Sequence, residues 1–503
     1  MLPLFRSSTR QKPVYLPLLR LFLFAAFVSL TACSRNPVTG KREVILMSKD
    51  QEIALGKESH PSVVATMGIY EDPKLQAFIN EKGKAMASIS HRPDLPYQFY
   101  IVDTPVVNAF AVPGGYVYFT RGIMAHFNNE AEFAGVLGHE IGHITARHSA
   151  RQQTTQLFGT AGLILGSVLL DKTGQLTEAA SQGLQLALLG YSRAHESESD
   201  GLGVEYSSKI GYDAKEMAEF FGTLKRIQDA SGQAIPEFQS THPDPGNRQA
   251  RVKQLATEYQ QQNPKNYEVD RDAYLRRIEG IIVGEDPKQG FVENDYFYHP
   301  ELKFQFPVPR GWQYQNAPSQ FQMGPKDGKS AMILMGAKGN TPDAAAQDFI
   351  TAQQLTVLQS EKTTINGNPA VFVVSKQQPQ QQQGQQQQQQ QNPNEQLQIG
   401  SWFIQFGNAV YGLHGLAQAG SFSNAFGTFK QVAGGFRTLT DSDKLNRQPD
   451  RIRIKAAPQD GTFGQIMANL GMPASRLDQL GTLNGLKSGD RITRGTLLKT
   501  LGR

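Results

Sequence analysis

Two histidines and a glutamate in His139-Glu140-Ile141-Gly142-His143 have the types and the spacing that a metal site can use. On a helix, which turns by about 100° per residue, His139 and His143 lie about 40° apart on one face. Two imidazoles one turn apart can both reach a single zinc ion. Glu140 lies beside that face, where its carboxylate can take a proton from zinc-bound water instead of binding the metal. The alternative is a pair of hydrogen-bonded core histidines on an ordinary helix.

A catalytic zinc usually has three protein ligands and one open position, so another element should supply the third ligand. The segment 192–200 (SRAHESESD) places Glu196 and Asp200 one helical turn apart. We predict that Glu196 is the third ligand and that Asp200 orients a ligand histidine. His195 is a weaker alternative ligand, and we expect Glu198 to face solvent. The competing interpretation is an acidic helix face exposed to water.

The helix that carries the motif needs a defined start and a buried environment. Asn129, with Glu132 three residues later, predicts an N-cap of the capping-box kind. The apolar residues that follow predict a largely buried helix through His143. We expect His148 on the same helix, about 180° from His139, where it cannot bind the same ion.

The motif at 139–143, followed about fifty residues later by Glu196 and Asp200, resembles the zinc metallopeptidases that include HtpX, the CAAX prenyl proteases and the periplasmic BepA-like proteases. The segment 108–119 (NAFAVPGGYVYF) is similar to the family's strand before the active-site helix, whose edge can pair with an extended substrate. An ordinary hairpin strand is the simpler interpretation. The segment 240–243 with Arg248 resembles a later family motif.

This resemblance covers about residues 45–260 and implies a zincin-type peptidase with one Zn²⁺ per chain. It also places His242, in the proline-stiffened loop 241–245, near the active-site cleft. A neutral imidazole there can occupy the open zinc position and keep the protease silent, or its N–H can stabilise a developing oxyanion. A surface residue is the third interpretation, and we favour the gating role. Integral members carry transmembrane helices and BepA-like members carry helical repeats; this chain shows neither pattern, so their substrates are not transferred.

The first 32 residues have a basic start and a short apolar run, which together predict a secretion signal. Leu30-Thr31-Ala32-Cys33 resembles a bacterial lipobox, which implies acyl chains on Cys33 that anchor the protein to a membrane. By the same resemblance, Ser34 favours the outer membrane, facing the periplasm. An uncleaved signal anchor is the alternative. Cys33 is the only cysteine, which excludes an internal disulfide and a cysteine metal site.

The predicted fold class is α+β, with a mainly helical peptidase domain that contains a small β-sheet. We expect, in order, a signal peptide 1–32, a tether 33–47, the peptidase domain 48–285, an α/β sandwich-like accessory domain 295–440, a linker 441–452 and a LysM-like module 453–503. The glutamine-rich stretch 377–396 predicts a disordered insertion in a hairpin loop of the accessory domain. The apolar stretch 157–170 is short for a membrane span of about 20 residues, so we expect a buried or surface-lying helix, with membrane contact as the alternative.

The composition limits the function classes. A net charge of +5 without a dense basic stripe argues against nucleic acid as a partner. The sequence predicts a zinc endopeptidase that acts on misfolded or misassembled proteins of the bacterial envelope. The alternatives are an envelope chaperone or scaffold with little proteolysis, and a peptidoglycan-acting hydrolase. Only the LysM-like tail suggests peptidoglycan as a partner.

Overall fold

The computed structural model describes residues 33–161, 190–231, 241–242, 247–377 and 396–503. Predictions about the signal peptide, about residues 162–170 of the apolar stretch and about residues 378–395 of the glutamine-rich loop lie outside the described residues. Among the described residues, no helix is both long and apolar enough to cross a membrane. The chain mixes helices and sheets, which confirms the α+β class.

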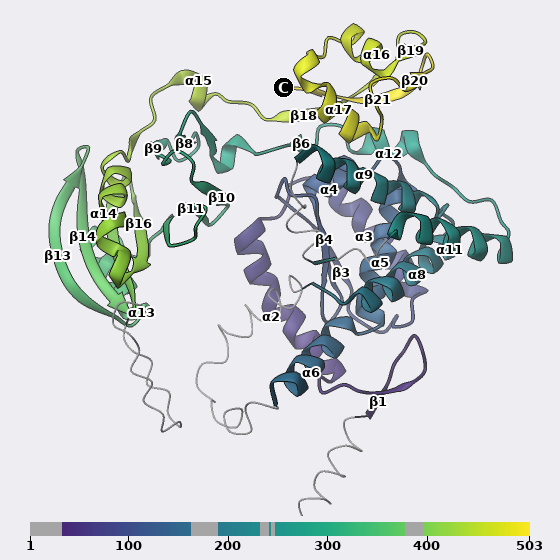
Figure 1. Ribbon diagram of the computed structural model, residues 1–503, viewed down its shortest axis with the longest axis horizontal. Helices are drawn as coiled ribbons and strands as arrows, with labels where there is room; N and C mark the ends of the chain where they lie inside the picture. Colours follow the sequence, from purple (N-terminus) through teal and green to yellow (C-terminus); the bar gives the residue numbers. More distant parts are fainter. Residues whose placement is uncertain (1–32, 162–189, 232–240, 243–246, 378–395) are drawn as a thin grey trace, which may run out of the picture.

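The N-terminal body, which we define as residues 33–283, contains most of the helices (Figure 1). Its helices are α2 (Lys49–Met67), α3 (Pro73–Ser88), α4 (Arg121–His126), α5 (Glu130–Thr145), α6 (His148–Ala161), α8 (Arg193–Lys209), α9 (Glu216–Ser231), α11 (Arg248–Gln262) and α12 (Arg271–Arg277). Its strands are β1 (Cys33–Arg35), β2 (Arg42–Val44), β3 (Gln98–Val102), β4 (Ala109–Val112), β5 (Tyr116–Thr120) and β6 (Ile282–Val283). In the central sheet β5 pairs parallel with β3 and antiparallel with β4, which leaves β4 at an edge.

Helices α5 and α8 approach closely because glycines line their contact. A Cβ atom on Gly138 would lie 3.0 Å from the Cα of Gly203, and one on Gly142 would lie 2.9 Å from the Ser199 hydroxyl. Larger side chains at these positions would push the helices apart. The glycines therefore bring the face of α5 that carries the motif against the face of α8 that carries Glu196.

Residues 33–47, which the sequence predicts as a tether, fold against the body. Strands β1 and β2 form a hairpin in which Cys33 pairs with Val44 and Arg35 pairs with Arg42. Asn36 is buried, and its side-chain oxygen accepts hydrogen bonds from two backbone N–H groups of the turn. An asparagine turn of this kind offers the backbone a fixed local structure.

The accessory domain is built from antiparallel strands with two covering helices. A seven-stranded sheet has the order β10-β11-β12-β16-β15-β14-β13, and a four-stranded sheet has the order β17-β9-β8-β7. The strands are β7 (Phe291–Glu293), β8 (Tyr296–His299), β9 (Phe304–Pro307), β10 (Gln313–Ala317), β11 (Gln320–Gly324), β12 (Ser330–Gly336), β13 (Leu355–Ile365), β14 (Asn368–Gln377), β15 (Leu397–Phe406), β16 (Ala409–Gln418) and β17 (Arg437–Thr438). The helices are η1 (Pro287–Gln289), α13 (Pro342–Ala352) and α14 (Ala419–Gly434).

The strands bear on the expected start of the accessory domain and on the position of its glutamine-rich loop. Strand β7 begins at Phe291, so the folded region starts before residue 295. Strands β14 and β15 pair antiparallel, with Lys376 opposite Gln398, so the glutamine-rich stretch joins two neighbouring strands as a hairpin connection does.

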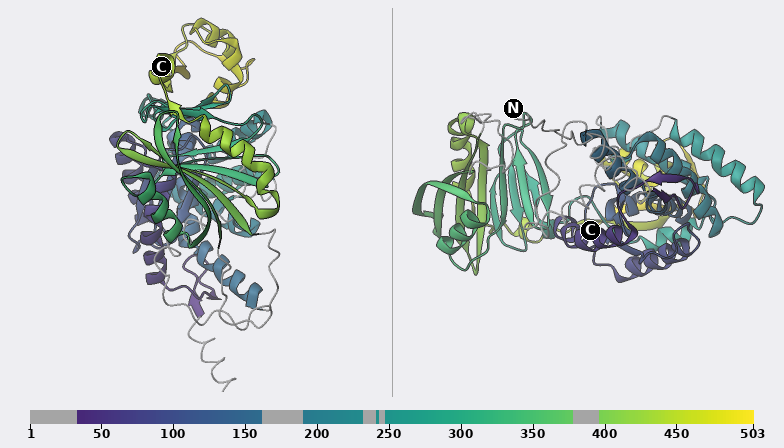
Figure 2. Two further views of the ribbon diagram at one scale, coloured as in Figure 1. Left: turned by 90° about the vertical axis from the view of Figure 1, so that its left-hand side faces the viewer. Right: turned by 90° about the horizontal axis from the view of Figure 1, so that it is seen from below.

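The C-terminal segment packs on the N-terminal body. It contains α15 (Ser442–Leu445), β18 (Asp450–Ala456), β19 (Gly461–Thr462), α16 (Phe463–Asn469), η3 (Ala474–Arg476), α17 (Leu477–Asn484), β20 (Arg491–Ile492) and β21 (Leu497–Gly502). Strand β18 pairs with β21 and also with β6 of the body, so the expected linker 441–452 already contains part of a strand. Figure 2 shows this segment seated at one end of the body.

A buried lysine fixes the contact between the two parts. The Lys499 amine is fully buried and donates hydrogen bonds to the carbonyls of Ala125 (2.9 Å), Phe127 (2.7 Å) and Leu483 (2.8 Å). The first two carbonyls lie at the end of α4, just before α5. Apolar residues of both parts also share one hydrophobic core. Residues 450–502 and the N-terminal body therefore form one packed unit.

Candidate active site

The motif lies on α5, as the sequence predicts. Asn129 is the N-cap, and its side chain accepts a hydrogen bond from the Glu132 N–H at 2.7 Å. The Glu132 carboxylate instead accepts from the Asn128 N–H at 2.7 Å, so the capping box is displaced by one residue. Every residue of α5 is buried. The helix is thus fixed at its start and enclosed along its length, which gives His139 and His143 defined positions.

Four buried side chains converge and could hold one metal ion. Ligand atoms of His139, His143, Glu196 and His242 all lie within 4.8 Å of one another. The Nε2 atoms of the two α5 histidines lie 2.9 Å apart, and each lies 3.4 Å from an oxygen of Glu196. Two imidazoles and a carboxylate are the donor set of many catalytic zinc sites. The residues present therefore fit a zinc ion, with His242 as a fourth donor.

His242 is buried, with 2% of its surface exposed, so the surface-residue interpretation is wrong. Its Nδ1 lies 3.2 Å from Glu196 Oε1 and 3.3 Å from His139 Nε2. Its Nε2 lies 3.2 Å from the Ala109 carbonyl on the edge strand β4. If Nε2–H donates to that carbonyl, Nδ1 is unprotonated in the neutral imidazole and directs a lone pair toward the cluster.

Glu140 is fully buried beside the cluster, and among the residues that the structure describes neither carboxylate oxygen has a hydrogen-bond partner. His242 Nε2 lies 3.5 Å from its Oε1. Burial raises the pKa of Glu140, although the neighbouring His242 and His139 oppose that shift. A buried carboxylate with a raised pKa and free oxygens can accept a proton from a water molecule placed at the cluster.

Asp200 contacts the far nitrogen of His139, whose Nδ1 lies 3.1 Å from Asp200 Oδ1. Arg248 donates to Asp200 at 2.7 Å, and Arg251 donates to the other carboxylate oxygen at 2.6 Å. Burial alone would raise the pKa of Asp200, but Arg248 and His139 outweigh it and lower that pKa. Asp200 is therefore an anion that holds the ring of His139.

Burial and the neighbouring polar groups also have opposing effects on the pKa values of the candidate ligands. Burial opposes charge on His139, but the hydrogen bonds to Asp200 and Glu196 outweigh it and raise the pKa of His139 to about 9. Burial lowers the pKa of His143 well below its usual value. Burial would raise the pKa of Glu196, yet His242, Arg248 and His139 hold it well below its usual range. The carboxylate of Glu196 is thus ionised, as a metal ligand must be.

His148 contacts the far nitrogen of His143, and the expectation that it shares a helix with His139 is wrong. Helix α5 ends at Thr145, and α6 begins at His148 after Arg147, whose backbone is left-handed with φ 58°. This corner turns the His148 ring back toward the site, where the two Nδ1 atoms lie 2.9 Å apart. His148 lies outside the four-residue cluster and supports one of its members.

Glu198 does not face solvent as expected. Its carboxylate lies 3.1 Å from His148 Nε2 and accepts a hydrogen bond from Arg151 at 2.8 Å. The His148 hydrogen bond, with help from Arg151, lowers the pKa of Glu198 to about 2. Arg151 also pairs with Glu43 of the β1–β2 hairpin at 3.2 Å. An unbroken series of polar contacts therefore runs from the hairpin to His143.

His195, the alternative ligand, lies outside the four-residue cluster and stacks on the His148 ring at 4.3 Å. Tyr191, which the sequence analysis missed, stacks on the His143 ring at 4.0 Å, and its hydroxyl contacts Ser149 at 2.9 Å. No sequence motif marks Tyr191, because its role depends on where its chain segment crosses the site.

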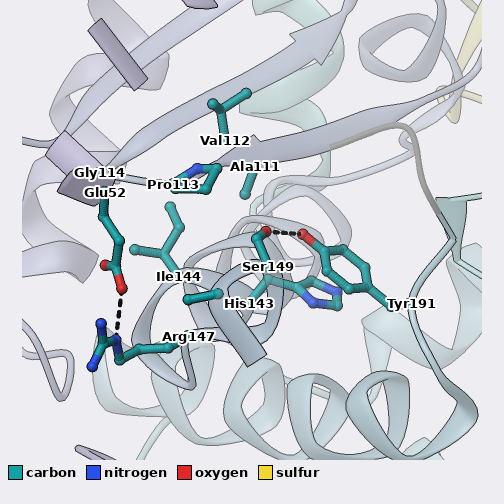
Figure 3. A pocket seen from close by; sticks show the side chains of 11 residues that line it. Glu52, Ala111, Val112, Pro113, Gly114, His143, Ile144, Arg147, Ser149 and Tyr191 are labelled. Atoms are coloured by element: carbon teal, nitrogen blue, oxygen red, sulfur yellow. Dashed lines mark hydrogen bonds and ion pairs between the residues drawn. The ribbon is translucent and has the colours of Figure 1, made fainter. Parts of the chain in front are cut away.

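A narrow pocket adjoins His143, between β4 and the corner that joins α5 to α6 (Figure 3). Tyr191 and Ser149 lie on one side of it, and the Glu52–Arg147 ion pair (2.6 Å) lies on the other. Glu52 also pairs with Arg92 at 2.6 Å, and Arg92 donates to the Ile144 carbonyl at 3.1 Å. These buried ion pairs hold the corner in place, and their partners are too distant in sequence for a motif to reveal them.

Comparisons with known proteins agree with this geometry. The family model of Peptidase family M48 matches residues 73–256 of this chain. The Beta-barrel assembly-enhancing protease of Yersinia pestis is 31% identical over 223 residues, which is 42% of this chain and 45% of that protein. The mitochondrial metalloendopeptidase OMA1 of Arabidopsis thaliana is 31% identical over 176 residues, 35% of each chain. The matches thus span less than half the length of these relatives.

One similar solved structure comes from a cyanobacterium. The cyanobacterial PsbP of Synechocystis sp. PCC 6803 aligns with 29% of this chain and 91% of its own, at 9% identity and a TM-score of 0.23.

Proposed function

We propose that this chain, whose residues 73–256 match the family model of Peptidase family M48, is a zinc-dependent endopeptidase of the bacterial cell envelope. The observation that supports this most is the convergence of His139, His143 and Glu196 beside the buried carboxylate of Glu140, for which the described part of the chain offers no hydrogen-bond donor. A binding protein has no need of a buried, unsatisfied carboxylate next to a ligand cluster, because such a group costs stability.

The residues divide the chemistry among them. A bound zinc ion would polarise the scissile carbonyl and lower the pKa of an attacking water to about 7. His139, His143 and Glu196 would hold the ion. Asp200 contacts Nδ1 of His139 and His148 contacts Nδ1 of His143, and these contacts fix the two histidine rings. Glu140 accepts a proton from the attacking water while the water oxygen forms a bond to the carbonyl carbon. Glu140 then gives that proton to the leaving nitrogen as the C–N bond breaks.

The edge strand β4 is the element on which an extended substrate would lie. Among the described strands none pairs with the outer edge of β4, and this edge adjoins the cluster, since the Ala109 carbonyl contacts His242. A peptide that pairs with β4 would gain backbone hydrogen bonds regardless of its sequence. His242 contacts this edge and is also the fourth member of the ligand cluster. We propose that it gates the site and withdraws when substrate enters.

The substrates that we propose are misfolded or misassembled envelope proteins. The name of the Yersinia pestis relative, a beta-barrel assembly-enhancing protease, motivates this class. Zinc-loaded protein should digest unfolded casein, lose that activity with a chelator and regain it with zinc. A Glu140→Gln variant that retains bound proteins would identify the natural substrates.

Biochemical assays would distinguish two other functions from this one. A chaperone or scaffold would suppress aggregation of unfolded proteins equally well with and without the chelator, and it would leave casein intact. A peptidoglycan hydrolase, which the LysM-like tail motivates, would release soluble fragments from purified sacculi. Binding of the intact chain to sacculi without their digestion would instead support peptidoglycan as a docking partner.

We propose that acyl chains on Cys33 anchor the protein in the outer membrane, facing the periplasm. The lipobox-like residues 30–33 and Ser34 motivate this location. Cys33→Ser should release the protein from lipid-dependent membrane fractionation. Persistent tight association would transfer the anchoring role to an uncleaved signal or to the stretch 157–170.

A further inference from the structure

The β1–β2 hairpin has a basic and apolar outer face next to Cys33. Along β2 and beyond it, Glu43, Ile45 and Met47 turn toward the body, whereas Arg42, Val44 and Leu46 are exposed. Val44 and Leu46, two large apolar side chains two positions apart, keep 45% and 44% of their surface exposed. We call the exposed residues of this hairpin the outer face; its members are Arg35, Lys41, Arg42, Val44 and Leu46.

The charges of the outer face have one sign. Arg35, Lys41 and Arg42 are exposed, and among the residues that the structure describes none of the three forms an ion pair. Glu43 is the only acidic residue between positions 33 and 47, and it is held by Arg151 and by the Asn36 amide. The face therefore offers uncompensated positive charge beside exposed apolar surface, a combination that suits anionic lipid headgroups above acyl chains.

The hairpin is fixed to the body, so the outer face is presented in one orientation. The Leu46 N–H donates to the Thr154 hydroxyl at 3.2 Å, and the Met47 carbonyl accepts from Arg147 at 2.6 Å. The inward side chains of Ile45 and Met47 pack with apolar residues of α2 and α6. Rotating the outer face toward the body would require these contacts to break.

We propose that the outer face docks on an anionic phospholipid surface and sets the orientation of the peptidase domain on the membrane. This inference rests on the proposed acylation of Cys33. Cys33 pairs with Val44 in the hairpin register, and directly opposed residues of antiparallel strands lie about 4.5–5.5 Å apart. An acylated Cys33 therefore brings the lipid surface to the depth of Val44. A protein partner would have no comparable reason to meet this face.

Docking here has a consequence for the whole chain. Figure 1 shows the hairpin and α6 at one end of the molecule and the C-terminal segment at the other. The N-terminal body, with its catalytic cluster, then lies next to the lipid. Residues 450–502 point away from the membrane, where a polymer in the compartment can reach them.

A fluorescent label at Leu46 tests the proposal in the acylated, full-length chain. Because Cys33 is the only cysteine, Leu46→Cys supplies the one free thiol once Cys33 is acylated. The matched control is Leu358→Cys, on the accessory strand β13, where the native side chain is 52% exposed. An environment-sensitive thiol dye is attached to each variant. Both are reconstituted in vesicles of phosphatidylethanolamine with phosphatidylglycerol, or of phosphatidylcholine alone.

We expect the label at 46 to shift to the blue and to be quenched by nitroxide lipids in the anionic vesicles, while the label at 358 stays in water. Neutralising Arg35, Lys41 and Arg42 to Gln should lower the docked-to-undocked ratio about a hundredfold, since each basic residue near an anionic surface contributes about fivefold. Casein digestion in detergent should be unchanged in this triple variant, which shows that it folds.

Three results would overturn the inference. Protein that floats with anionic vesicles while the label at 46 stays in water refutes docking and leaves the anchor intact. Protein that does not float with vesicles refutes acylation, and the docking face with it. A label at 46 that is already shielded without vesicles indicates a second protein molecule on this face. Casein digestion tests the peptidase separately from all three.

Discussion

If His242 gates the site, as we propose, replacing it by alanine should raise the proteolytic activity. Its Nε2–H can donate to the Ala109 carbonyl at 3.2 Å, which leaves the unprotonated Nδ1 3.2–3.3 Å from Glu196 and His139. An oxyanion donor would need a proton on Nδ1, and that tautomer gives up the contact with Ala109. The hydrogen bond alone contributes about 1 kcal/mol, or about fivefold in favour of the closed state. A metal ion held by the cluster would add to this preference.

We therefore expect kcat/KM for unfolded casein to rise by at least about fivefold in His242→Ala, at equal zinc content by elemental analysis. His299→Ala, in the accessory domain, is the matched histidine control and should leave the rate unchanged. A fall of about 10²–10³ would instead assign His242 to the oxyanion. A rate equal to that of the native protein over several substrates would exclude both roles.

Four further predictions follow from the contacts. Glu140→Gln should retain zinc and abolish proteolysis, whereas Glu196→Ala should lower the zinc content; a full equivalent of tightly bound zinc in Glu196→Ala would refute its role as a ligand. His148→Phe should weaken zinc binding about 10–100-fold in a chelator competition, because His143 loses the partner of its Nδ1, and unchanged affinity would contradict that support. Lys499→Met should lower the free energy of unfolding by roughly 3 kcal/mol in urea titrations, because three buried carbonyls lose their hydrogen-bond donor. An unchanged urea midpoint would show that these hydrogen bonds do not stabilise the fold. Burial lowers the pKa of His414 to about 4, so between pH 6.5 and 4 the unfolded chain binds a proton at this residue that the folded chain does not. The free energy of unfolding is therefore retained above pH 6.5 and falls by about 3 kcal/mol toward pH 4. This loss should be smaller in His414→Gln.

The local part of the site was predictable from the sequence. Residues one helical turn apart share a face, which places His139 with His143, and Glu196 with Asp200, before any tertiary contact is known. The N-cap at Asn129 was predictable for the same reason, because capping depends on residues within one turn. Convergence of the two helices was expected because a catalytic zinc needs a third protein ligand, and the glycines at the helix contact give the convergence a physical cause.

What the sequence did not reveal depends on chain reversals and on contacts between distant segments. His148 was assigned to the wrong helix because Arg147 adopts a left-handed backbone that no common propensity rule predicts. Glu198 was expected in water because its partners, His148 and Arg151, come from a helix that periodicity had merged with α5. The hairpin at 33–47 was taken for a tether because a short polar segment carries little hydrophobic pattern.

The polar contacts behind the cluster make the metal site depend on most of the N-terminal body. Each α5 histidine directs Nε2 into the cluster and Nδ1 to a fixed partner, Asp200 in one case and His148 in the other. Asp200 is held by arginines of α11, and the contacts of His148 extend through Arg151 to the hairpin beside Cys33. A ligand ring that loses its partner rotates more freely and binds metal less tightly. A chain with an unfolded hairpin or α11 should therefore bind zinc weakly, so a competent protease forms only once both ends of this network are in place.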